Sequence, residues 1–114
     1  MQKNKLEIVS EISANHNQSE KILLTMIDKL GLSKEITCIK LQAFSPEECT
    51  SKIRKFKLEK GLWKGQILYE LMKKAYTPEN LLQKGVHRIR SVGKKVMLSI
   101  NGEDDFNKIR KYNP

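Results

Sequence analysis

Short β-type stretches alternate with longer amphipathic stretches along this chain, and that alternation constrains the fold more than any other feature of the sequence. Apolar and β-branched residues favour strands over residues 6–13, 36–44 and 95–100. Apolar residues at helical spacing predict helices over residues 20–30, 66–75 and 78–92, with a last short helix over residues 104–112. Strands that alternate with helices pair in parallel through right-handed crossovers. We therefore predict an α/β fold with three parallel strands.

Local signals fix several helix ends. Ser19 is a predicted N-cap, and Gly31 is predicted to end the same helix as its C′ residue. Thr77, Pro78 and Glu79 together predict a helix start, with threonine as the N-cap, proline at the first position and an acid near the positive end of the dipole. Residues 47–65 show no clear period and predict an excursion with little regular structure.

The spacing of the strands indicates the architecture. The first two strands begin near residues 6 and 36, which matches the roughly 31 residues per unit of an eight-stranded barrel. We expect one domain over residues 1–114: a partial (β/α)8 TIM barrel with about its first three βα units. A small flavodoxin-like sheet is the competing architecture, but that fold has about five strands.

Composition excludes several classes of protein. With 114 residues, 39% hydrophobic and 31% charged, the chain is not collagen-like, disordered or a disulfide scaffold. Cys38 and Cys49 have no metal-ligand spacing and are expected to be thiols. The sequence contains no long apolar run and no signal-peptide pattern at its start, so we expect no membrane association and a cytoplasmic location.

The net charge of +9 raises the question of nucleic-acid binding. The basic residues are spread along the chain, with one denser stretch over residues 52–64 that matches no known nucleic-acid-binding signature. We favour solvated basic surface over a nucleic-acid site, because net charge alone bears on solubility and association rather than on function.

Two charged residues lie in otherwise apolar strands. Side chains alternate along a strand, so Glu11 should share a face with Val9, and Lys40 should share a face with Cys38 and Gln42. Glu11 and Lys40 both fall near the carboxyl ends of neighbouring parallel strands, where α/β folds place their active sites. A purely structural ion pair is an equal alternative to an active site, since a charged side chain in an apolar strand needs either an oppositely charged partner or a functional role.

The loop after the first strand carries Asn15 and His16, whose amide and imidazole can hydrogen-bond hydroxyls and phosphate oxygens. Such residues are also good turn formers. The other histidine, His87, falls mid-helix and is predicted to lie at the surface. The two histidines have no acid in ligand spacing, so the sequence predicts no metal site in this chain.

Several motifs resemble the sialic acid synthase family, and most resemble its pseudaminic acid synthase branch. These motifs are Ser-Glu-Ile-Ser-Ala-Asn-His-Asn-Gln-Ser at 10–19, Ile-Lys-Leu-Gln at 39–42, Gly-Leu-Trp at 61–63, Leu-Tyr-Glu-Leu at 68–71 and Ala-Tyr-Thr-Pro at 75–78. They occur in the family's order and at about its spacing over nearly the whole chain.

The resemblance implies a function in nonulosonate biosynthesis. The family is a (β/α)8 barrel followed by a small antifreeze-like domain. It is a transferase that condenses phosphoenolpyruvate with an N-acylated amino sugar, and a divalent metal, Mn2+ or Mg2+, activates the sugar aldehyde. On this pattern Glu11 is the catalytic carboxylate, Lys40 holds phosphoenolpyruvate with Gln42 beside it, and Asn15 and His16 line the sugar side.

The sequence also departs from the family. Where the family's third strand ends in Ser-Thr-Pro-Phe, this chain has Ser99, Ile100, Asn101 and Gly102, so an apolar side chain replaces a threonine that contacts phosphoenolpyruvate. The family's metal-binding histidines lie on later strands. The resemblance therefore implies the N-terminal third of a synthase, with no cofactor held by this chain alone. One partner that it implies is a second chain that supplies the other strands.

Two classes of function follow. In the first, the chain is part of a phosphoenolpyruvate-condensing synthase and is inactive alone. In the second, it is a small, basic, non-catalytic binding module that keeps the fragment fold.

Overall fold

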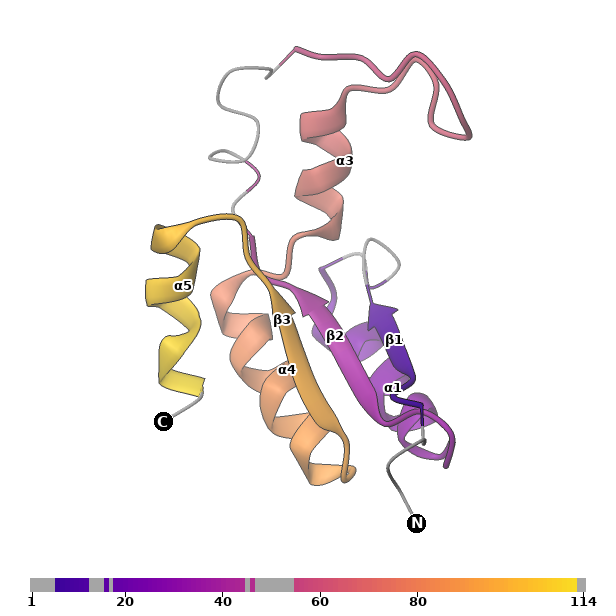
Figure 1. Cartoon of the computed structure of the whole chain (residues 1–114), viewed down its shortest axis with the longest axis vertical. Coiled ribbons are helices and arrows are strands. Elements are labelled where there is room, and N and C mark those ends of the chain that lie inside the picture. The colour runs from indigo at the N-terminus through magenta and orange to yellow at the C-terminus, as the bar shows by residue number, and fades with distance from the viewer. Residues whose placement is uncertain (1–5, 13–15, 17, 45, 47–54, 113–114) are drawn as a thin grey trace.

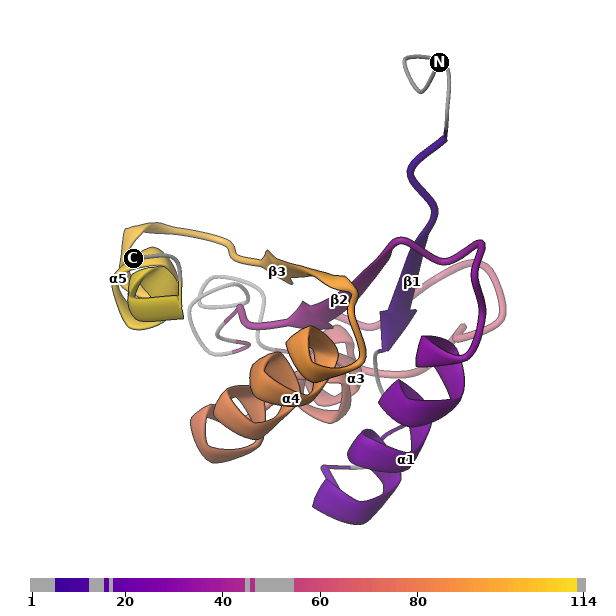
Figure 2. The same ribbon diagram turned by 90° about the horizontal axis from the view of Figure 1, so that it is seen from below.

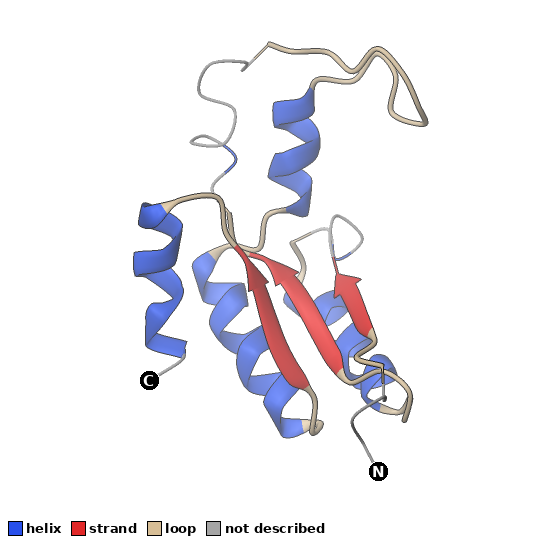
Figure 3. Ribbon diagram, viewed as in Figure 1, coloured by secondary structure: helices blue, strands red, loops and turns tan. Residues whose placement is uncertain are grey.

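The computed structural model describes residues 6–12, 16, 18–44, 46 and 55–112. Three parallel strands form one sheet in the order β1–β2–β3, with β1 at Val9–Ile12, β2 at Cys38–Gln42 and β3 at Lys95–Ser99. All three strand arrows point to the same edge of the sheet (Figure 3). The predicted α/β class, strand order and parallel pairing are confirmed.

Two helices cover one face of this sheet. Helix α1, Glu20–Gly31, connects β1 to β2, and helix α4, Glu79–Ser91, leads into β3. Both lie on the same side of the sheet (Figure 2). Helix α5, Glu103–Ile109, and the 3-10 helix η2, Arg110–Tyr112, follow β3.

Helix α3, Leu68–Ala75, lies beyond the carboxyl ends of the strands (Figure 1). Residues 55–67 before it form a hairpin-like loop, in which Lys57 and Ile67 make an isolated antiparallel bridge. The predicted excursion therefore contains little regular structure in its described part.

The core lies between the sheet and the two covering helices. In the strands, the buried face is the one that carries Ile12, Ile39 and Leu41, because these alternate with the residues of the opposite face. Its buried members are Ile12, Leu23, Ile27, Ile39, Leu41, Ala43, Leu81, Leu82, Val86 and Ile89. This core fixes the register of the sheet, since a shift by one residue would expose it.

The opposite face of the sheet carries three of the predicted site residues, Glu11, Lys40 and Gln42. Among the described residues, no helix packs against this face, and Val9 and Met97 are 39% and 45% exposed there. In a closed barrel the corresponding face lines the interior.

Two predicted helix ends differ in the structure. Helix α1 includes Gly31 as its last residue, and the next residue, Leu32, is the C-cap. A Cβ on Gly31 would lie 2.8 Å from the Cβ of Val92. Glycine is therefore needed at this position because two segments of the chain approach closely, and not because the backbone makes a left-handed turn. By contrast, Ser19 is the N-cap as predicted, and its side chain accepts a hydrogen bond from the Ile22 amide.

The start of α4 is the second difference. Pro78, not Thr77, is the N-cap, and no side chain caps this helix. Thr77 is fully buried, and its hydroxyl lies next to His16 instead. The predicted threonine cap is wrong because a partner 61 residues away takes that hydroxyl.

Candidate functional site

The candidate site lies on the uncovered face of the sheet, at the carboxyl ends of β1 and β2. Glu11 and Lys40 are direct partners in the parallel register, and Lys40 pairs with Met97 on its other side. The Nζ of Lys40 lies 3.7 Å from Oε2 of Glu11, and the two side chains are 29% and 41% exposed. The predicted meeting of this carboxylate and this ammonium on one face is confirmed.

Gln42 completes the cluster from the last residue of β2. Its Nε2 donates a hydrogen bond to Oε1 of Glu11. Each carboxylate oxygen of Glu11 therefore faces a different partner, one an amide and the other a cation. This arrangement orients the carboxylate and leaves the ammonium, at 3.7 Å, outside hydrogen-bond distance of it.

Two polar side-chain atoms that have no hydrogen-bond partner in the described part of the chain lie at the same carboxyl edge of the sheet. Among the described side chains, Gln42 Oε1 and Ser99 Oγ are buried and make no hydrogen bond. Gln42 and Ser99 are register partners at the ends of β2 and β3. Buried polar groups are nearly always paired, so these two atoms can hydrogen-bond a ligand or a water at this edge. Ser99 was not among the predicted site residues, although its place at the end of a parallel strand was a signal.

His16 occupies a different environment from the other predicted site residues. Its side chain is fully buried, with Nδ1 accepting a hydrogen bond from the Gln18 amide at 2.7 Å and Nε2 lying 3.3 Å from Oγ1 of Thr77. Burial lowers the pKa of this imidazole below its ordinary value. Its predicted contact with a sugar stays a prediction, and Asn15 lies outside the described residues.

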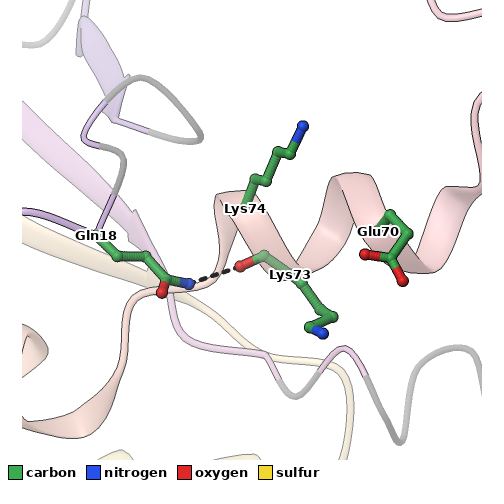
Figure 4. Close-up of a pocket in the computed structure, with 4 residues that line it drawn as sticks. All are labelled: Gln18, Glu70, Lys73 and Lys74. Atoms are coloured by element: carbon green, nitrogen blue, oxygen red, sulfur yellow. Dashed lines mark hydrogen bonds between the residues drawn. The ribbon is translucent and has the colours of Figure 1, made fainter.

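Gln18 connects the same loop to α3. Its side-chain Nε2 donates to the carbonyl oxygen of Lys73 at 2.7 Å (Figure 4). The same Nε2 also donates to the carbonyl oxygen of Tyr76 at 3.4 Å. These carbonyls lie at the end of α3, where a helix leaves its last acceptors without internal partners. The side chains of Gln18, Glu70, Lys73 and Lys74 line a small cavity there.

A larger, mostly apolar cavity of about 520 Å3 lies between Gln42, α3 and the 55–67 loop. It is lined by Gln42, Phe44, Leu58, Trp63, Leu68, Leu71, Met72, Lys74 and Ala75. Its size is within the range of small-molecule sites, and Gln42 joins it to the polar cluster.

The described residues do not themselves fit the divalent metal that the resemblance implies. They contain no group of three or more His, Cys, Asp or Glu side chains that could hold a metal ion. His87 is exposed on α4, far from this cluster in the sequence, as expected. Within the same described ranges, none of the helices is both long and apolar enough to cross a membrane.

The sheet and this cluster define the chain as a partial α/β barrel with a polar site at its carboxyl edge. Its structure matches the N-acetylneuraminic acid (sialic acid) synthetase of Leptospira borgpetersenii serovar Hardjo-bovis, solved in complex with citrate, with a TM-score of 0.75 and 19% sequence identity. This match covers 96% of this chain and 34% of that one.

Comparison with the sequences of known proteins gives a consistent result. Pseudaminic acid synthases of two Campylobacter jejuni subsp. jejuni strains, of serotypes O:23/36 and O:2, are each 29% identical to this chain over 112 residues. The match covers 96% of this chain, which spans about a third (32%) of the length of each relative. No family model matches. Together these matches support the resemblance: over nearly its whole length the chain is similar to about a third of a pseudaminic or sialic acid synthase.

Proposed function

We propose that this chain supplies the phosphoenolpyruvate-binding part of a synthase that condenses phosphoenolpyruvate with an N-acylated amino sugar. The observation that carries the proposal is the Glu11–Lys40 pair, placed by register at the carboxyl edge of the sheet and on its uncovered face. The similarity to pseudaminic acid synthases supports the same reaction class.

Each residue of the cluster has a role suited to its chemistry. The Lys40 ammonium binds the phosphate or carboxylate of phosphoenolpyruvate, because a partly buried cation attracts an anion more strongly than one in bulk water. The Glu11 carboxylate, fixed by Gln42, lies beside the carbons that react. In the overall reaction C3 of phosphoenolpyruvate forms a bond to the sugar aldehyde carbon, one water is consumed, and phosphate leaves with formation of a nine-carbon α-keto acid.

The remaining groups of the site come, in this proposal, from βα units outside these 114 residues. The matched relatives are about three times as long as the region they share with this chain. Those units are supplied either by more of the same polypeptide or by a second chain. The 114-residue chain alone is then expected to bind phosphoenolpyruvate without turning it over.

A chimera tests this function. The shared 112-residue region of the Campylobacter pseudaminic acid synthase is replaced by this chain, and phosphate release is measured with phosphoenolpyruvate, Mn2+ and an N-acylated amino sugar. We expect turnover that Lys40→Ala and Glu11→Gln reduce at least 100-fold. Lys95→Ala is the matched control, since Lys95 pairs with Glu7 at the opposite end of the same face.

A folded chimera that turns over equally well with Lys40→Ala would contradict the proposal. A folded chimera with no turnover, together with an isolated chain that still binds anions, would favour the non-catalytic binding module.

A further inference from the structure

A continuous set of contacts connects buried His16 to the candidate site. His16 Nε2 lies 3.3 Å from Thr77 Oγ1, and the backbone amide of Thr77 donates to the carbonyl oxygen of Gln42 at 2.9 Å. The side chain of Gln42 in turn donates to Glu11. His16 is therefore linked to Glu11 through two intervening residues, Thr77 and Gln42.

The hydrogen bonds of His16 define its protonation state. Because Nδ1 accepts a hydrogen bond from the Gln18 amide, its lone pair is in use and the ring proton of the neutral form resides on Nε2. That Nε2 faces Thr77, and the ring also makes a hydrogen bond with the Ala75 backbone. A second proton could only go to Nδ1, where it would meet the Gln18 N–H.

We propose that neutral His16 is a positioning residue, which holds Thr77 against the end of β2 at Gln42, and that a second proton on Nδ1, by opposing the Gln18 N–H, displaces the ring and so releases this hold. His16 would act through Thr77 and the backbone of Gln42, without contact with the substrate. The importance of this hold for catalysis rests on the proposed function, whereas the link between His16 and Gln42 does not.

Burial supports the neutral state. The His16 side chain is fully buried, and this burial lowers the pKa of the imidazole, against the opposing effect of its backbone hydrogen bonds. At neutral pH the ring is therefore uncharged. The proton that releases Gln42 is taken up only at a pH below the ordinary value of 6.5.

Several charged side chains lie on the elements around His16. They include Glu11 of β1, Glu20 of α1, Glu70, Lys73 and Lys74 of α3, and Glu79 of α4. His87 is the other histidine in the sequence, and it is exposed on the far part of α4.

Nuclear magnetic resonance of the 15N-labelled 114-residue chain tests this link without any ligand. The His16 ring, the Thr77 amide and the Gln42 side-chain amide are followed from pH 7.5 to 5. We expect all three to change with one shared midpoint below 6.5. His16→Asn keeps an acceptor near the Nδ1 position, His16→Gln keeps a donor near the Nε2 position, and neither can take up the proton.

We expect the Gln42 transition to disappear in both His16 variants and to persist in His87→Gln, the matched control. A Gln42 transition that survives in the His16 variants would overturn the proposal. If both His16 variants fail to fold, the pH titration of the unaltered chain still tests the link. A shared midpoint of the His16 ring and the Gln42 side-chain amide supports the link, and separate midpoints overturn it. Because no substrate is used, failure of the proposed function leaves this readout intact.

Discussion

Glu11 and Lys40 occupy paired positions of two parallel strands, and their charged groups meet at 3.7 Å on the one sheet face that the described helices leave uncovered. An ion pair in this place costs desolvation and is held by specific partners, here the amide of Gln42. The pair is therefore the structural element around which the proposed anion site is built.

Neutralising Glu11 should strengthen anion binding. Glu11→Gln removes a negative charge close to Lys40 while it keeps an oxygen that can accept from Gln42. We expect about 2- to 5-fold tighter binding of phosphoenolpyruvate, since a partly exposed pair of this kind contributes at most ~1 kcal/mol. Calorimetric titration measures it. Glu7→Gln, at the other end of the face, should leave affinity unchanged, and weaker binding by Glu11→Gln would contradict the electrostatic role given to the pair.

Gly31→Ala should destabilise the fold. The added methyl would lie 2.8 Å from the Cβ of Val92, an atom attached directly to the backbone that cannot move without it. We expect a loss of about 1–3 kcal/mol in the free energy of unfolding, even though alanine is the better helix former. Urea denaturation measures this loss. Thr25→Ala, at an exposed position of the same helix, should change stability little, and equal stability of the two variants would show that the Gly31–Val92 approach is not tight.

The stability of the chain should depend on the protonation of His16. Because folding lowers the pKa of His16, the folded state favours the neutral ring. This contribution is fully present above the ordinary pKa of 6.5 and is lost as the pH falls through the lowered value. A single group of this kind gives a slope of at most about 1.4 kcal/mol per pH unit.

Urea denaturation between pH 7 and 5 measures this slope. His16→Gln should flatten it, and His87→Gln should retain it. A slope that His16→Gln leaves unchanged would assign the pH dependence to other groups.

The parts of the fold that depend on local sequence could be predicted. Periodicity places all three strands and the helices, and Ser19 caps α1 because its partner, the Ile22 amide, is three residues away. The Glu11–Lys40 meeting also follows from alternation along two strands and their parallel pairing.

The features that the sequence did not predict depend on distant partners. The Thr77 hydroxyl faces His16, 61 residues away, and so does not cap α4. Gly31 is required by Val92, which becomes its neighbour only when α1 and α4 pack together. The burial of His16 likewise results from the contact of one loop with the α3–α4 junction, which no local pattern contains.

The most direct test of the central claim is a titration of the 114-residue chain with phosphoenolpyruvate. We predict saturable binding that Lys40→Ala weakens about tenfold, because hydrogen bonds to a charged group contribute ~1.5 kcal/mol or more. Lys95→Ala, which removes a cation from the opposite end of the same sheet face, should leave the affinity unchanged. Binding that is absent in the unaltered chain, or that both variants weaken equally, would contradict the account.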